Sequence, residues 1–235
     1  MPELSDVELS DADVMGIIEK IWSLKGSVSE GFISLERFES ITTPGRFVSL
    51  QFWRDEECAF LGTRRLMALA RKTGRPAHIL HVSTAEELEY LKDFRDIATC
   101  EVTPQHLTLA GEDAYPRIGT FAQMNPPIRS GAHRDGLWHW LRQGVPDVLG
   151  SDHAPHTLEE KAKTYPDSPS GMPGVQTLLP LMLNHVAEGR LTLQRLIDLT
   201  SAGPQRIFGL VGKGRIVPGY VADFTVVDLK ARWTV

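Results

Sequence analysis

The residues with the clearest potential for chemistry lie in one short run. Residues 150–156 read GSDHAPH, so Asp152, His153 and His156 closely follow the apolar run 145–149. An apolar run of this length predicts a buried strand, and α/β sheets and barrels keep their sites at the carboxyl ends of such strands. A carboxylate and two imidazoles in that position indicate a metal-dependent hydrolytic site.

Strands and helices alternate on both sides of this run, which predicts a parallel α/β sheet that would position it. The pattern predicts helices over residues 56–73, 85–94, 135–143, 175–188 and 193–199, strands over 75–83, 97–103 and 145–151, loops through 125–130 and 164–174, and short antiparallel strands over 213–229.

The first 53 residues have a different pattern. Apolar residues recur at helical spacing over residues 11–25, which predicts an amphipathic helix. Two β-rich runs then flank the turn sequence TTPG, so residues 31–53 are expected to form a hairpin.

Composition limits the possible partners and locations. The chain has 235 residues, 42% of them apolar, enough for one large core or two small ones. A net charge of -5 argues against nucleic acid. No apolar run approaches the roughly 20 residues that span a bilayer, and the first residues are acidic. We therefore expect no membrane partner and a cytoplasmic location. Cys58 and Cys100 are too few for a disulfide framework.

From about residue 54 onward the chain resembles the carboxyl-terminal half of the class I dihydroorotases, members of the amidohydrolase superfamily. The matching motifs are WRDEE, HILHVSTAEEL, EVTPQHLTL, MNPPIRS, GSDHAPHT, SGMPGVQT, LTSAGPQRIFG and KGRI-PGY-ADFTVVD, in family order. The resemblance implies an α/β fold with a partial (β/α)8, TIM-type barrel over residues 54–210. Residues 211–235 would then be part of the accessory β-domain, and residues 1–53 a small α+β segment of helix and hairpin.

The same resemblance assigns roles to individual residues. It makes His81 of HVST a metal ligand, and Asp152 both a metal ligand and the catalytic acid–base. Asn125 and His156 would bind the substrate, and backbone groups at Pro173 and Gly174 would close over its ring. The implied reaction is the reversible hydrolysis of dihydroorotate to N-carbamoyl-L-aspartate in pyrimidine synthesis, with zinc as the cofactor.

Several ligands of the family's metal centre have no counterpart in this sequence. The family uses a His-x-His pair on its first strand and further ligands on middle strands, whereas none of the eight histidines precedes His78. His81 and Asp152 fall short of the three protein ligands of a catalytic zinc site. The chain is therefore expected to be incomplete as a single-chain enzyme. Some dihydroorotase-like chains that lack ligands are noncatalytic partners of aspartate carbamoyltransferase, which is the alternative function; a hydantoinase or allantoinase activity is a further one.

Residues 11–57 weakly resemble a second family, the antibiotic-biosynthesis monooxygenase-like domains of ferredoxin-like fold. Domains of that family dimerise through their sheets, so the resemblance implies that the hairpin edge could recruit a second copy and form a homo-oligomer. The WRDEE motif belongs to both resemblances, which indicates a junction of two sequences near residues 53–57. A purely oligomerising module is thus a third functional class.

Each assigned residue also has a plainer structural interpretation. His81 could be a hydrogen-bonded core residue, and Asp152 and His156 could belong to a solvent-facing turn. Asn125 before two prolines could only stiffen a loop. His78, His106 and His153 are expected to support neighbouring residues, and His133, His139 and His185 to lie on helix surfaces.

Overall fold

The computed structural model describes residues 32–39, 47–53 and 56–232. The chain divides into two compact units, Met1–Ala59 and Phe60–Val235, and each is described here by itself.

The first unit contains a β-hairpin. Strand β1 (Phe32–Glu39) pairs antiparallel with strand β2 (Phe47–Trp53), and Arg37 lies opposite Ser49 in the register. The expected hairpin is thereby confirmed. The helix expected over residues 11–25 lies outside the described residues, and the likeness of this unit to monooxygenase-like domains stays a prediction.

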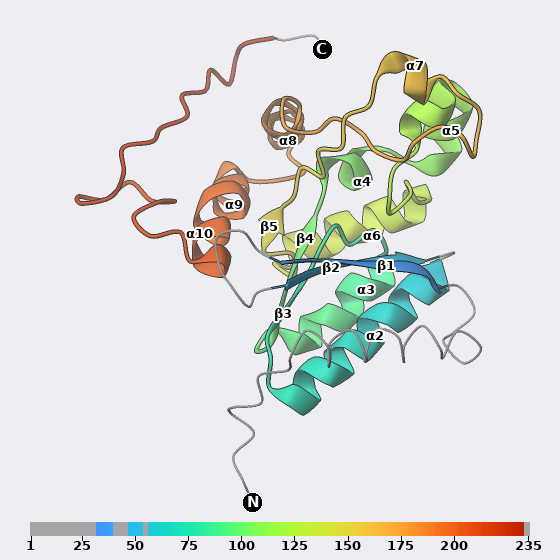
Figure 1. Cartoon of the computed structure of the whole chain (residues 1–235). Coiled ribbons are helices and arrows are strands. Elements are labelled where there is room, and N and C mark those ends of the chain that lie inside the picture. Colours follow the sequence, from blue (N-terminus) through green and yellow to red (C-terminus); the bar gives the residue numbers. More distant parts are fainter. Residues whose placement is uncertain (1–31, 40–46, 54–55, 233–235) are drawn as a thin grey trace, which may run out of the picture. The chain divides into compact units, whose positions relative to one another are not determined.

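The second unit is an alternation of helices and short strands (Figure 1). Its elements in chain order are α2 (Glu56–Thr73, beginning before the division), β3 (Ala77–Ile79), α3 (Ala85–Leu91), η2 (Lys92–Phe94), β4 (Ala98–Val102), α4 (Pro104–Thr108), α5 (Gly111–Ile118), η3 (Gly119–Ala122), α6 (Gly131–Arg142), β5 (Val148–Leu149), α7 (Leu158–Lys161), α8 (Leu178–Ala187), α9 (Leu193–Ile197), η4 (Asp198–Ala202) and α10 (Gly203–Phe208).

The three strands of this unit form one parallel sheet in the order β3-β4-β5. His78 lies opposite Thr99 between the first two strands, and Val102 lies opposite Leu149 between the other two. The parallel arrangement predicted from the alternation is confirmed. Because all three strands run in one direction, their carboxyl ends meet at the same edge of the sheet.

Helices cover this sheet through apolar side chains that exclude water. The core includes the fully buried side chains of Met67, Leu88, Val102, Leu107, Trp138, Leu141, Met182, Leu196 and Leu199. Helices α3 and α6 pack closely, because Gly136 leaves room for Ala85: a Cβ added at Gly136 would lie 2.3 Å from the Ala85 Cβ. Helix α3 begins at Thr84, whose side chain accepts a hydrogen bond from the Glu87 N–H.

Two parts of the second unit differ from the sequence prediction. The stretch before residue 125, which no helix prediction covered, contains the short helices α4 and α5. Residues 213–229, expected to form antiparallel strands, form turns and irregular chain instead (Figure 1). That prediction is wrong: the apolar alternation is present, but a strand also needs a hydrogen-bonded neighbour, and no other described segment pairs with this one. Within the described part of the chain, no helix has both the length and the apolar character to cross a bilayer.

Candidate active site at the carboxyl ends of three parallel strands

Three chemically active side chains lie at or just beyond the ends of the parallel strands. His81 follows β3, Glu101 lies near the end of β4, and Asp152 follows β5. Strand β4 lies between β3 and β5, and the main-chain N–H of His81 donates to the Glu101 carboxylate. The structure therefore has the two predicted metal ligands just beyond the strands that flank β4, and it adds a carboxylate on β4 that the sequence interpretation did not include.

The backbone is strained at both predicted ligands. His81 has a φ of 35° and Asp152 a φ of 43°, and no other non-glycine residue of the described ranges has a positive φ. This left-handed region is sparsely populated by residues with a Cβ, and such strain persists only where the surroundings impose it. Strained residues cluster at functional sites, so the backbone singles out these two positions independently of their side chains.

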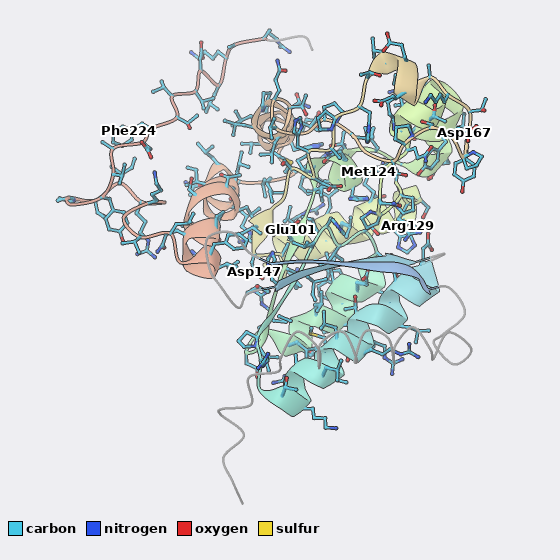
Figure 2. All side chains as sticks on the ribbon, in the orientation of Figure 1. Glu101, Met124, Arg129, Asp147, Asp167 and Phe224 are labelled. Atoms are coloured by element: carbon cyan, nitrogen blue, oxygen red, sulfur yellow. The ribbon has the colours of Figure 1, made fainter. Side chains whose placement is uncertain are left out.

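Glu101, labelled in Figure 2, lies on the central strand β4 and contacts the segment that follows β3. One carboxylate oxygen, Oε1, accepts the main-chain N–H of His81 at 3.2 Å, and Oε2 lies 3.5 Å from His78 Nε2. Only 13% of the Glu101 side chain is exposed. A Cβ on Gly150 would lie 2.5 Å from Oε1, so the glycine of GSDHAPH leaves space for this carboxylate. The available signal was a glutamate within the otherwise apolar strand sequence IATCEVT.

Burial changes the proton affinity of Asp152. Partial burial raises the pKa of its carboxyl above the usual range, the negative charge of Glu101 raises it further, and His81 opposes both effects. Burial dominates because it removes the water that would stabilise the charged form. A carboxyl with a raised pKa accepts a proton more readily near neutral pH, as a general acid–base must.

The donor atoms present at this edge do not by themselves complete a zinc site. His81 Nδ1 is buried without a hydrogen-bond partner, which suits a metal-facing nitrogen. Asp152 supplies a second oxygen ligand of the right chemistry. However, the described residues contain no group of three or more histidine, cysteine, aspartate or glutamate side chains arranged to hold a metal ion. A catalytic zinc site needs three protein ligands, so a zinc ion is not accommodated by the described residues alone.

The residues predicted to bind substrate lie on two loops beside this edge. Asn125 is exposed and precedes Pro126. His156 is also exposed, and its Nε2 lies 3.2 Å from the Ser170 carbonyl oxygen. Pro173 is exposed, whereas Gly174 is buried. The substrate-binding roles of these four residues stay predictions.

Gly174 is tied closely to the strand end that carries Asp152. Its N–H donates to His153 Nδ1 at 3.0 Å, and a Cβ at this position would lie 2.2 Å from the Ser151 carbonyl oxygen. The backbone N–H of Gly174 is thus already engaged by His153. Any contact of this segment with a ligand must therefore come from its other backbone groups.

His106 supports the loop that carries Asn125. Its ring is 2% exposed, Nε2 lies 3.0 Å from the Pro126 carbonyl oxygen, and Nδ1 lies 2.8 Å from Thr103 Oγ1. Since a carbonyl only accepts, Nε2 carries the hydrogen and Nδ1 accepts from the hydroxyl. Burial lowers the pKa of His106 to about 4.

This buried imidazole makes stability depend on pH. The unfolded chain binds a proton at His106 below about pH 6.5, whereas the folded chain does not until about pH 4. The contribution of His106 is therefore complete above pH 6.5 and is lost as the pH falls towards 4, by about 3 kcal/mol in total. Urea denaturation of the wild type and of His106→Gln across this range measures it. We expect a smaller pH slope in the variant; equal slopes would contradict the buried, neutral state.

Three comparisons relate the chain to known proteins. The sequence profile of the amidohydrolase family matches residues 56–234. A dihydroorotase of Halobacterium salinarum is 42% identical over 176 residues, covering 75% of this chain and 41% of that protein. A dihydroorotase of Geobacter metallireducens is 36% identical over 214 residues, covering 89% of this chain and 47% of that protein. The chain thus spans less than half the length of these curated relatives.

Solved structures show a similar arrangement. The L-hydantoinase (dihydropyrimidinase) of Arthrobacter aurescens is 33% identical with a TM-score of 0.68, over 72% of this chain and 39% of that one. The dihydropyrimidinase of Brevibacillus agri is 27% identical with a TM-score of 0.67, over 72% of this chain and 39% of that one.

Proposed function

The chain belongs to the amidohydrolase family, and from that membership we infer that it acts in the opening and closing of a cyclic amide. Its parallel strands and helices form part of a (β/α)8-type barrel. We propose that the ring is dihydroorotate and the open form N-carbamoyl-L-aspartate. The observation that carries this proposal is the pair of residues with left-handed backbone, His81 and Asp152, just beyond the ends of β3 and β5 on either side of β4, in a chain whose relatives are named dihydroorotases.

Asp152 is the proposed proton-transfer group. When the ring opens, a water oxygen bonds to the ring carbonyl carbon, and Asp152 takes the proton that the water loses. The carbon–nitrogen bond then breaks, and Asp152 returns the proton to the departing nitrogen. Asp152 must hold the proton after the water has lost it and before the ring nitrogen receives it. The raised pKa of its carboxyl supports this role.

Asn125 and His156 are the proposed anchors of the substrate. Dihydroorotate carries a carboxylate, which accepts hydrogen bonds from an amide N–H and from an imidazole N–H. Because Nε2 of His156 faces the Ser170 carbonyl oxygen, Nδ1 is the ring nitrogen proposed to donate to the substrate. Both side chains are exposed on loops beside the strand ends, as a ligand-facing pair must be. Backbone groups at Pro173 and Gly174 are proposed to contact the ring. Holding the substrate in this way lowers the entropic part of the barrier.

Zinc is the proposed cofactor, although the described residues supply too few ligands to hold it. The family and its dihydroorotase members imply a metal, and the described residues offer His81 and Asp152 as ligands. At least one further ligand must come from outside the described residues, from this chain or a partner. A second copy of the chain is one proposed source, which makes a homo-oligomer part of the proposal. A cytoplasmic location is also proposed, in keeping with Cys100 as a buried free thiol.

Two alternatives rest on specific observations. The two solved structures described above, which resemble this chain, are a hydantoinase and a dihydropyrimidinase, and this favours a hydantoin-type ring as a second substrate class. The shortage of ligands favours a noncatalytic role, as a structural partner of an aspartate carbamoyltransferase.

One set of measurements separates these functions. The purified full chain is supplied with zinc, its metal content is measured, and ring closure of N-carbamoyl-L-aspartate is followed beside hydrolysis of dihydroorotate and of hydantoin. Turnover of N-carbamoyl-L-aspartate and dihydroorotate by the zinc-bound chain supports the proposal. Turnover of hydantoin alone supports the first alternative. Absence of zinc and turnover, with a stable complex with the carbamoyltransferase, would replace the proposal by the structural role.

A further inference from the structure

Lys161 is a buried lysine that the proposed chemistry does not use. The residue is 5% exposed, and its Nζ donates to the carbonyl oxygens of Gln123 and Pro169, each at 2.9 Å. No charge–charge interaction acts on this ammonium within the part of the chain that the structure describes. A buried cation is costly unless its donors are satisfied, so these two carbonyls must stay in place around it.

The two carbonyls belong to the two loops that carry the proposed substrate anchors. Gln123 is on the first loop, residues 123–130, two residues before Asn125. Pro169 is on the second loop, residues 153–174, which follows β5, carries His156 and contains the short helix α7 with Lys161 itself. We call Lys161 Nζ and these two carbonyls the clasp, because together they join one loop to the other.

Further hydrogen bonds join the same loops. Gln123 Nε2 donates to the Ser168 carbonyl oxygen and to Ser170 Oγ, both at 3.1 Å. The Gly171 N–H donates to the Gln123 carbonyl oxygen at 3.0 Å, so that oxygen accepts from both the clasp ammonium and the second loop. In Figure 2, Met124 labels the first loop and Asp167 labels the second.

The clasped segment lies against the imidazole of His156. His156 Nε2 is 3.2 Å from the Ser170 carbonyl oxygen, and a Cβ at Gly171 would lie 3.0 Å from the same nitrogen. The same Cβ would also lie 2.5 Å from the Ala154 carbonyl oxygen. Residues 170–171 therefore determine where the imidazole can sit, and the clasp determines where residues 170–171 sit.

We propose that Lys161 is a positioning residue that fixes the loop of Asn125 against the loop of His156, so that both side chains reach one substrate carboxylate. This inference rests on the proposed function for its substrate. The part of the inference that concerns how Lys161 holds the two loops together does not depend on that function. Lys161 touches neither the substrate nor the reacting atoms; it acts through the backbone of the two loops.

The kinetic test uses Lys161→Met, which keeps much of the side-chain length and removes the donors. Misplaced anchors weaken substrate binding before and during reaction, so we expect KM for dihydroorotate to rise on the order of tenfold or more with a much smaller change in kcat. Lys163→Met is the matched control, since it removes a lysine ammonium at an exposed position two residues away. A fall in kcat at unchanged KM would overturn the positioning role.

Hydrogen exchange tests the clasp without turnover. In the substrate-free Lys161→Met protein, the amides of Ala154 and Gly171 should lose protection, while those of α6 keep it. Unchanged protection at both amides would overturn the inference even if the chain proves to be a dihydroorotase. Conversely, a local loss of protection supports the clasp even if dihydroorotate is not the substrate.

A second variant is needed if amide hydrogen exchange becomes faster throughout the second unit of Lys161→Met, since the substitution would then have disturbed the whole fold. Gln123→Ala removes the side-chain donors to Ser168 and Ser170 and keeps the carbonyl that Lys161 needs. It should raise exchange at Gly171 alone among the compared amides. Retained protection in Gln123→Ala, together with global loss in Lys161→Met, would make Lys161 a general core residue and overturn the proposal.

Discussion

Asp152→Asn is expected to lower kcat for ring closure and ring opening by between about 10² and 10⁴-fold, the contribution of a positioned general acid–base. Asparagine keeps the shape of the side chain but cannot take the proton from water. It also tolerates the left-handed backbone at this position, where φ is 43°, so the fold should be retained. The measurement is steady-state turnover in the assembly in which the wild type is active.

The matched control for this substitution is Asp113→Asn, which makes the same chemical change at an exposed residue of α5. It should leave kcat unchanged. Circular dichroism of both variants would show that the fold is intact. If Asp152→Asn kept kcat within about threefold of the wild type, proton transfer would have to be assigned to another group.

The largest effect on stability is expected for Trp138→Ala. Trp138 is 2% exposed, its Nε1 donates to the Leu107 carbonyl oxygen at 2.7 Å, and its ring meets that of His185 edge-on with centroids 4.9 Å apart. Truncating a buried tryptophan costs about 3–5 kcal/mol. Since domains are stable by only about 5–15 kcal/mol, a large part of the free energy of unfolding should be lost.

Urea denaturation followed by circular dichroism measures this loss. Trp138→Phe should cost less, because it keeps an aromatic ring and leaves only the Leu107 carbonyl without its donor. Trp140→Ala, on the same helix but only half-buried, is the control for removing a tryptophan. A cost for Trp138→Ala no larger than that for Trp140→Ala would contradict the central place of Trp138 in the core.

Much of the second unit could be predicted from its sequence. The strands and their parallel order follow from short apolar runs separated by helical periodicity, and the structure confirms both. Helix α3 has clear local signals, with Thr84 as its cap and acidic residues in its first turn. Where propensity, capping and burial agree in this way, the prediction holds.

The failures occur where the outcome depends on what packs against a segment. His185 was expected on a helix surface, but it is 4% exposed, because Trp138 and Thr108 cover it. The apolar pattern of residues 213–229 gave no information about whether a neighbouring strand would be present. Both errors concern tertiary neighbours, which periodicity alone does not specify.

The candidate site was predicted in part. The sequence pointed to His81 and Asp152 through motifs and through their place after apolar runs, and the structure has them just beyond the ends of β3 and β5. Its one signal for Glu101 was a glutamate within a predicted strand, and a single glutamate there is usually interpreted as a solvent-facing residue. The contact depends on Gly150, whose missing side chain makes room across the sheet for the carboxylate.

At His81 and Asp152, the left-handed backbone means that the residue best for folding differs from the residue needed for the proposed chemistry. Glycine would occupy either conformation without steric penalty, so a protein selected only to stay folded would gain by exchanging both residues. Laboratory evolution for thermal tolerance, with no demand for turnover, should therefore drift towards glycine there. Evolution under metabolic demand should retain the imidazole and the carboxylate despite the strain.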